Sequence, residues 1–245
     1  MKALKNHIIR LKILVKGKVK NKAVLAILKP LYTTLKAFFY FCIGDVATAQ
    51  NEMRWAIVWV RNNYFKSSIF IFENEIRTSM LFPKNILDKT IEMAHPQTVL
   101  DLGCGVGKSL DYFISKGIDT LGVEGSSLAI SEANNSRCIL KFDLSKELNL
   151  RKKYDLIWSF EFVEHIHPNY INNLMKTFEN HSNTVIMSAA QPFQGGDGHF
   201  NEQPQAYWVE QFKRHGYEFN IEKTEELRNI DERYSKNMYV FERKS

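Results

Sequence analysis

Residues 98–109 read TVLDLGCGVGKS. The apolar start of this segment predicts a short buried strand, followed by a turn with Gly103, Gly105 and Gly107 and then by the start of a helix. Glycines permit the left-handed backbone and let the chain approach a ligand closely. Asp101, near the end of the strand, offers a carboxylate to a polar ligand. The segment therefore predicts a nucleotide-type binding turn.

The spacing of the glycines separates this turn from two better-known phosphate-binding loops. A Walker A loop ends in Gly-Lys-Ser, as residues 107–109 do, but its first glycine would fall on Leu102, inside the strand. The dinucleotide fingerprint G-x-G-x-x-G has its third glycine where this chain has Lys108. Neither motif fits completely.

The nine residues from Val99 to Gly107 closely resemble motif I of the class I S-adenosylmethionine-dependent methyltransferases. The resemblance implies an α/β, Rossmann-like fold, with a seven-stranded, mostly parallel sheet and helices on both faces. It also implies S-adenosylmethionine as the methyl donor. The residues that it places at the donor are Asp101, Gly103, Cys104, Gly105 and Gly107.

Charge is distributed unevenly along the 245 residues, whose net charge is +6. Residues 1–44 hold ten basic residues and no acidic residue, which leaves 23 basic against 27 acidic residues in the remainder. A protein that binds extended nucleic acid carries a basic patch or stripe on its domain. The slightly acidic body therefore argues against extended nucleic-acid contacts.

The basic arm, residues 1–44, alternates apolar and basic positions. Its longest uncharged apolar run, residues 37–43, is far shorter than the roughly 20 residues of a membrane-spanning helix. Lysines also interrupt every candidate core of a secretory signal. Two interpretations stay open: a basic amphipathic segment on an anionic membrane surface, or a helix that packs on the catalytic domain or acceptor site.

The chain has an odd number of cysteines, and they lack the spacing of metal ligands: Cys42, Cys104 and Cys138. This pattern favours a reducing compartment. We expect a cytoplasmic protein, peripheral at the inner face of the membrane if the arm binds lipid. The sequence does not predict an oligomeric state.

Residues 45–95 are expected to form a helical region before the catalytic core. In residues 51–61, NEMRWAIVWVR, apolar residues recur at helical spacing, and Trp55 and Trp59 lie four apart. Such an aromatic stripe is typical of a buried core, and the alternative is a lid over the acceptor.

Residues 96–245 form the expected donor-binding methyltransferase domain, in which strands and helices alternate. Helices are expected to begin near Lys108 and Ser126. Further helices are predicted over residues 170–178 and 205–215, and strands from Thr98 and over residues 120–124, 138–142, 154–159, 184–188, 217–223 and 237–243.

Carboxylates end the second and third predicted strands. Glu124, 23 residues after Asp101, falls where an acidic group can accept both ribose hydroxyls, with Gly125 and Ser126 beside it. The simpler interpretation is a solvated loop carboxylate. Asp143 and Leu144 resemble the family's third signature, which flanks the adenine; alternatively, Asp143 caps a helix from Ser145 onward.

Residues 159–168, SFEFVEHIHP, resemble the segment after the fourth strand in ubiquinone-pathway O-methyltransferases and in small-RNA 3′-terminal 2′-O-methyltransferases. The resemblance implies a divalent-metal site for Mg²⁺, Mn²⁺ or Zn²⁺. The alternative is that the segment lines the donor site through Ser159 and Glu161, with His165 as a cap or general base. The residues that the resemblance places at the metal are Glu161, Glu164, His165 and His199.

Residues 191–208, QPFQGGDGHFNEQPQAYW, crowd polar and aromatic groups around three glycines. Such a density exceeds what a connector requires and predicts an acceptor-binding loop, against the alternative of a plain surface loop. His199 is the first candidate for the general base and His165 the second, and Asp197 is a further catalytic candidate.

These residues predict O-methylation of a small molecule or saccharide by in-line transfer, because a neutral histidine suits removal of a hydroxyl proton. The aromatic-proline signature of amino-group DNA and protein methylases is missing after the fourth strand. Two alternatives stay open: metal-assisted 2′-O-methylation of an RNA end, and a donor-binding regulatory module without turnover.

Overall fold

The chain divides into two compact units, Met1–Ser67 and Ser68–Ser245, and the helices and strands given below belong to the second. The basic arm, except for three helical residues, and the expected helical region up to residue 81 lie outside the described residues. Within the part of the chain that is described, no helix has the length and apolarity to cross a bilayer. The computed structural model describes Leu35, Phe38, Cys42, residues 82–192, Gln194, His199 and residues 201–243.

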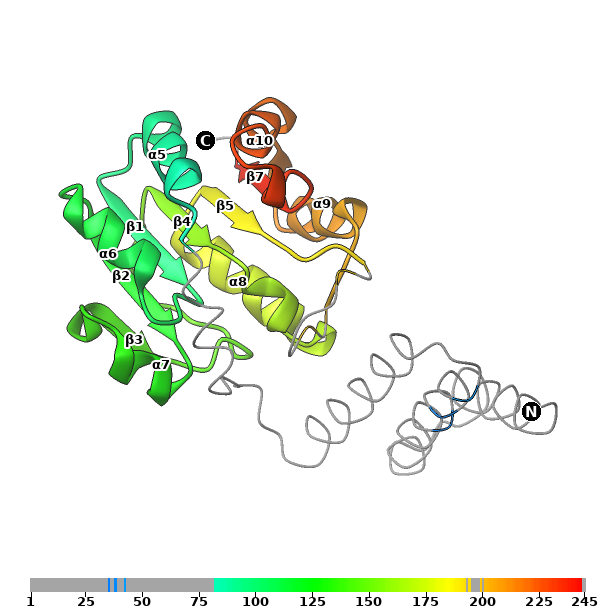
Figure 1. Cartoon of the computed structure of the whole chain (residues 1–245), viewed down its shortest axis with the longest axis horizontal. Coiled ribbons are helices and arrows are strands. Elements are labelled where there is room, and N and C mark those ends of the chain that lie inside the picture. The colour runs from blue at the N-terminus through cyan, green and yellow to red at the C-terminus, as the bar shows by residue number, and fades with distance from the viewer. Residues whose placement is uncertain are drawn as a thin grey trace. The chain divides into compact units, whose positions relative to one another are not determined.

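Seven strands form one sheet in the order β3-β2-β1-β4-β5-β7-β6 (Figure 1). Strand β7 pairs antiparallel with β5 and β6, whereas the other pairs are parallel. The predicted seven-stranded, mostly parallel sheet is confirmed. The strands are β1 (Thr98–Leu102), β2 (Asp119–Glu124), β3 (Ile139–Lys141), β4 (Leu156–Ser159), β5 (Thr184–Ser188), β6 (Glu218–Phe219) and β7 (Met238–Glu242).

Helices flank the sheet (Figure 1). From residue 82 onward, the described residues form six α-helices: α5 (Lys84–Ala94), α6 (Lys108–Ser115), α7 (Ser127–Glu132), α8 (Ile171–His181), α9 (Gln205–Arg214) and α10 (Ile221–Arg228). Four short 3₁₀ turns join them: η2 (Ser136–Cys138), η3 (Val163–His165), η4 (Pro168–Tyr170) and η5 (Glu232–Tyr234).

Two hydrophobic cores lie on opposite faces of the sheet. Leu100 and Leu102 of β1 belong to one core with residues of α8 and α9, whereas Val99 belongs to the other with residues of α5, α6 and α10. Successive side chains of a strand point to opposite faces, so a strand that is buried on both faces reads as a continuous apolar run. The prediction of helices on both faces is therefore confirmed.

The strand order reverses at β1, which lies between β2 and β4. Asp101 is the register partner of Gly122 in β2 and of Trp158 in β4. In an open parallel sheet, ligands bind beyond the carboxyl ends of the strands at such a reversal. The ends of β1, β2, β4 and β5 therefore define the edge that carries the site.

The predicted strand over residues 217–223 is wrong beyond Phe219. Asn220 ends the strand because its side-chain oxygen accepts a hydrogen bond from the backbone N–H of Lys223 at 3.0 Å and so caps α10. The third strand is also shorter than predicted, because Cys138 belongs to η2. In contrast, Gly107 has a φ of 74° directly before α6, so Lys108 begins a helix as predicted.

Candidate active site

The glycine turn after β1 uses the left-handed backbone that its sequence predicts. Gly103, Gly105 and Gly107 have φ values of 75°, 55° and 74°. The backbone N–H of Gly103 donates to the carbonyl of Val123 at 2.9 Å, which fastens the start of the turn to β2. Cys104 turns its side chain toward β2, since a Cβ on Gly122 would lie 2.7 Å from its Sγ. Only the backbone of Cys104 is therefore suited to contact a donor.

Phe162 covers the first glycine of this turn. A Cβ on Gly103 would lie 2.1 Å from ring atoms of Phe162, a distance that real Cβ contacts do not reach. Gly103 is thus required both by its φ and by the space that the ring occupies. The contact joins the turn after β1 to the segment after β4.

Glu124, at the end of β2, closes the donor turn from the other side. Its Oε2 accepts the backbone N–H of Gly105 at 3.0 Å, and its Oε1 accepts that of Ser126 at 2.7 Å. Burial raises the pKa of Glu124, and the N–H groups of Ser126, Gly105 and Gly125 offset part of this effect. Only 8% of Glu124 is exposed, so it is not a solvated loop carboxylate. Ser126 in turn caps α7 by accepting the N–H of Ala129 at 3.2 Å.

Asp101 is a second buried acidic group at the predicted donor site. Its Oδ2 has no hydrogen-bond partner among the described residues. Burial, with a further contribution from the charge of Glu124, raises the pKa of Asp101 to about 8. A buried carboxylate oxygen without a partner, beside a turn with left-handed glycines, fits a ligand that brings its own hydrogen-bond donor or positive charge. These residues therefore fit S-adenosylmethionine.

Asp143 and Leu144 follow β3 at the same edge of the sheet. Asp143 Oδ1 accepts the backbone N–H of Ser145 at 3.0 Å and its hydroxyl at 2.6 Å. No helix follows, so Asp143 caps a turn and not the helix that one interpretation expected. Leu144 is 4% exposed and belongs to the core that contains α8.

The segment after β4 is held by β1 and β5. Ser159 Oγ donates to the carbonyl of Leu102 at 3.1 Å, so this hydroxyl fixes the strand end. Glu161 has a φ of 50°, a left-handed conformation that is rare outside glycine. Ser188 Oγ accepts the backbone N–H of Glu161 at 2.6 Å and donates to its Oε1 at 2.8 Å. Burial raises the pKa of Glu161, and the contacts with Ser188, His199 and Asn237 oppose this shift.

Glu164, in η3, lies deeper than Glu161. It is completely buried, and neither carboxylate oxygen has a hydrogen-bond partner among the described residues. Burial raises the pKa of Glu164 well above its usual range, and the charge of Glu161 raises it further. The carbonyl of Glu164 accepts the N–H of Asn201 at 2.9 Å, which anchors this part of the loop that the sequence predicts to bind the acceptor.

Two histidines meet beside these glutamates. The rings of His165 and His199 lie edge to face, with centroids 5.0 Å apart and planes at 87°. His199 Nδ1 lies 3.1 Å from Glu202 Oε1, and both side chains are nearly buried. The structure therefore brings together the two histidines that the sequence proposes as bases, and it adds Glu202. Asp197, the third catalytic candidate, lies outside the described residues.

The expected metal site is not assembled. No group of three or more His, Cys, Asp or Glu residues within the described ranges is arranged to hold a metal ion. The physical reason lies in the partners that the expected ligands have: Glu161 is bonded to Ser188, and His199 to Glu202. We derive no catalytic step that requires a metal.

The donor turn and the histidine pair are linked through two consecutive residues. Phe162 contacts Gly103 of the donor turn. Its neighbour Glu161 lies close enough to His199 for the histidine to lower the pKa of that carboxyl. A donor at the turn and an acceptor at His199 would therefore lie on either side of residues 161–162.

Three residues of this site carry no motif. Ser188 and Asn237 contact the predicted site residues from elements distant in sequence, whereas Glu202 contacts His199 from three residues away in the same loop. The sequence carries a signal for Ser188, as a polar residue that ends an otherwise apolar strand, TVIMS, and for Glu202, as an acidic residue close to His199. Only the tertiary structure places Asn237.

The comparison with known families agrees with the fold and the donor turn. Residues 77–228, more than half of the chain, match a family model described as a methyltransferase domain. The chain therefore belongs to this methyltransferase family. Membership of this family agrees with the methyl donor that motif I implies, S-adenosylmethionine.

Individual relatives are more distant. A protein of Invertebrate iridescent virus 6 that is named as a methyltransferase, 235L, is 32% identical over 129 residues, which cover 49% of this chain and 45% of the viral protein. The match thus spans less than half of the viral relative.

Solved structures show the fold alone, because their identities are low. A TehB-like S-adenosylmethionine-dependent methyltransferase from Corynebacterium glutamicum superposes with a TM-score of 0.53 at 19% identity, covering 70% of this chain and 94% of the other. The methyltransferase domain of bacterial CtHen1-C gives a TM-score of 0.50 at 20% identity, covering 65% and 100%.

Proposed function

We propose that the enzyme methylates a hydroxyl group of a small molecule or saccharide, with His199 as the general base. The observation that carries this proposal is the pairing of His199 Nδ1 with Glu202 Oε1 at 3.1 Å, beside the ring of His165. Glu161, which lies close to His199, directly precedes Phe162, the residue that contacts the donor turn. Histidine paired with a carboxylate is an effective proton acceptor near neutral pH.

Each group has a defined part in the transfer. When bound, S-adenosylmethionine supplies a methyl group that its sulfonium has already activated. Asp101 and Glu124 hold the donor at the glycine turn. With donor and acceptor bound, His199 Nε2 would take the proton of the acceptor hydroxyl while the donor would supply the methyl group to that oxygen. Glu202 orients the imidazole through Nδ1–H and stabilises the positive charge that it gains.

The test compares His199→Gln with wild-type enzyme. Transfer of labelled methyl from S-adenosylmethionine is measured across monosaccharides, catechols, hydroquinones and primary amines. We expect transfer to hydroxyl compounds, a loss of about 100-fold or more in His199→Gln, and unchanged donor affinity. His95→Asn, at the exposed end of α5, is the matched histidine control. Transfer to amines alone, or full activity of His199→Gln, would overturn the proposal.

A second candidate, which the sequence left open, is methylation of the terminal ribose of an RNA with the help of a metal, although the described residues assemble no metal-binding cluster. The observation in its favour is Glu164, whose buried carboxylate has no partner among the described residues and lies near Glu161. Treatment with EDTA followed by Mg²⁺ or Mn²⁺, with RNA ending in ribose or in 2′-deoxyribose, tests it. Methyl transfer that is unchanged by chelation and that does not require the 2′-hydroxyl would rule out this candidate.

We propose in addition that residues 1–44 attach the enzyme to the inner face of an anionic membrane from the cytoplasm. Ten basic residues and no acidic one in this arm support the proposal. Binding to phosphatidylserine vesicles, measured by sedimentation, should require the arm and should weaken in high salt. Equal binding by a chain that starts at Asp45 would contradict it.

A further inference from the structure

The segment that follows the proposed adenine residues has no secondary structure of its own. Residues 145–150, here called the strap, connect Leu144 to the residues before β4. Backbone polar groups in such a segment must find partners elsewhere. The partners are side chains on one helix.

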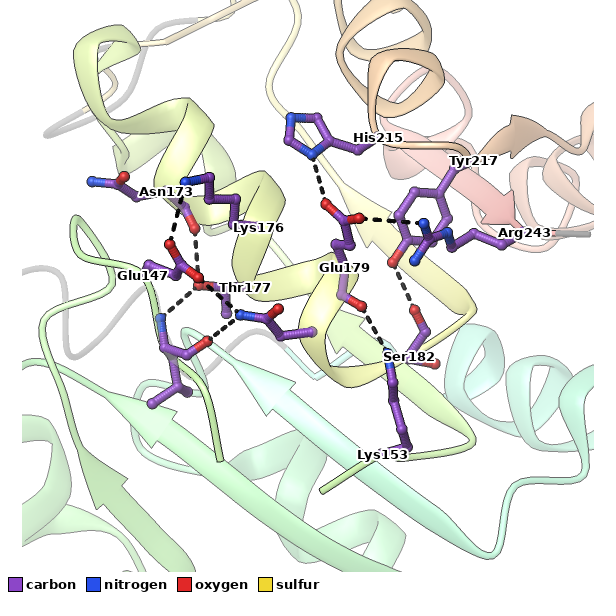
Figure 2. Close-up of polar contacts among 12 residues, drawn as sticks. Glu147, Lys153, Asn173, Lys176, Thr177, Glu179, Ser182, His215, Tyr217 and Arg243 are labelled. Carbon is purple, nitrogen blue, oxygen red and sulfur yellow. Dashed lines mark hydrogen bonds and ion pairs between the residues drawn. The ribbon is translucent and has the colours of Figure 1, made fainter. Parts of the chain in front are cut away.

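Helix α8 supplies four side chains that bind the strap backbone. These residues are separated by four, three and one positions, which places them on one side of the helix. They are Asn173, Thr177, Asn180 and His181. Figure 2 shows Asn173, Lys176 and Thr177 on the side of α8 that faces Glu147 of the strap. Glu179 points the other way, toward His215 and Arg243. The bonds are Asn173 Nδ2 to Ser145 O (2.8 Å), Leu148 N to Thr177 Oγ1 (2.9 Å), Asn180 Nδ2 to Leu148 O (3.1 Å) and Leu150 N to His181 Nε2 (2.9 Å).

His181 is the only ionisable member of these four side chains, and its tautomer follows from its partners. Nε2 accepts the N–H of Leu150, so the proton must lie on Nδ1, which donates to the carbonyl of Thr177 at 2.7 Å. The ring is completely buried. A second proton on Nε2 would face the N–H of Leu150 and remove that hydrogen bond.

The surroundings of His181 keep it neutral at pH 7. Burial lowers the pKa of His181, Lys153 lowers it further, and the Thr177 carbonyl opposes both. Lys153, ahead of β4, is the charged group that faces the ring, and its Nζ donates to the carbonyl of Glu179 on α8 at 2.8 Å. The phenol of Tyr154, with ring centroids 6.4 Å apart, is the other ionisable neighbour.

We propose that His181 is a proton-sensitive positioning residue for the adenosine end of the donor site. Neutral His181 fixes Leu150 and, with the other three side chains, the strap; doubly protonated His181 releases Leu150 and loosens Asp143 and Leu144. Acid therefore weakens donor binding through a residue that does not touch the donor. This inference rests on the proposed role of Asp143 and Leu144 at the adenine.

The experiment measures the Kd of S-adenosylhomocysteine by calorimetry between pH 5.5 and 8, with no acceptor present. His181→Gln keeps an acceptor within reach of Leu150 but cannot take a proton. His181→Asn is too short to reach Leu150. His215→Gln is the control, because His215 binds Glu179 on the side of α8 away from the strap (Figure 2). Thermal unfolding confirms that each variant is folded.

Below pH 6.5, the affinity of wild type and of His215→Gln for S-adenosylhomocysteine should fall about fivefold more than that of His181→Gln. A fivefold change is the effect expected from the loss of one hydrogen bond. His181→Asn should bind about fivefold more weakly at every pH, with faster hydrogen exchange in the strap. Acid weakening of His181→Gln equal to that of wild type, or an unchanged Kd for folded His181→Asn, would overturn the inference. Neither result depends on which acceptor is methylated, so failure of the O-methylation proposal is detected separately.

Discussion

Ser188 Oγ makes two hydrogen bonds to Glu161, accepting its backbone N–H at 2.6 Å and donating to its carboxylate at 2.8 Å. One hydroxyl at the end of β5 thus holds both the left-handed backbone and the side chain of the residue that follows β4. Because Phe162 and His199 adjoin Glu161, we expect the Ser188–Glu161 pair to set the distance between the proposed donor and acceptor sides.

Ser188→Ala should therefore affect both stability and catalysis. The backbone N–H of Glu161 loses its partner, which should lower the free energy of unfolding by about 1–3 kcal/mol in urea titrations. The released segment should also lower kcat for methyl transfer. Ser131→Ala, which removes an exposed hydroxyl bonded only to the carbonyl of Leu128, is the control and should change neither quantity. Equal behaviour of the two variants would contradict the role of Ser188.

Gly103→Ala tests the contact with Phe162. Gly103 and Gly117 both have positive φ, 75° and 78°, but a Cβ would meet Phe162 at 2.1 Å in the first and nothing within 4 Å in the second. Gly117→Ala should cost about 1–2 kcal/mol of stability from backbone strain alone, with donor affinity kept. Gly103→Ala should cost more and should abolish measurable donor binding in calorimetry. Similar losses in the two variants would show that the ring contact is unimportant.

Asp101→Asn should change how stability depends on pH. The pKa of Asp101 is raised from 3.8 to about 8 in the folded protein, so between these values the folded state holds a proton that the unfolded state has lost. Stability from this group therefore falls as pH rises from 4 to 8, and the variant lacks this loss. Urea unfolding at pH 5 and 8 should show the variant gaining on wild type by up to several kcal/mol at pH 8. Parallel pH curves would contradict the buried, neutral Asp101.

Glu202→Gln tests the orienting partner of the base. The amide keeps a contact with His199 but cannot stabilise an imidazolium, so kcat should fall by about 10- to 100-fold while the donor Kd stays unchanged. Glu210→Gln is the control, because Glu210 forms an exposed ion pair with Arg214 at 2.9 Å. An unchanged kcat in Glu202→Gln would remove Glu202 from the mechanism.

The sequence predicts the central sheet and the donor turn well because both depend on local patterns. Gly103 and Gly107 stand where the chain needs a left-handed turn, and the apolar run of β1 is buried on both faces. The last predicted strand but one is too long, because the capping ability of Asn220 outweighs the β-propensity of its neighbours and the strand ends at Phe219. Local chemistry therefore decides most boundaries.

The acceptor side is predictable only in part. Motif resemblance and loop composition identify His165 and His199, and the structure places them 5.0 Å apart. Asn237 becomes a site residue through chain folding that no local spacing encodes, whereas Glu202 lies only three residues after His199. The strap is also invisible in the sequence, because its hydrogen bonds join residues about 30 positions apart, such as Leu150 and His181.

The sheet ends in very short strands on both sides. Strand β3 has three residues and β6 has two, so each edge exposes few backbone groups to a neighbouring chain. A strand from another molecule would find little to pair with, which protects the fold against edge-to-edge aggregation. Within the described residues, any assembly of two copies would have to be built on helix surfaces and loops, not on a continuous intermolecular sheet.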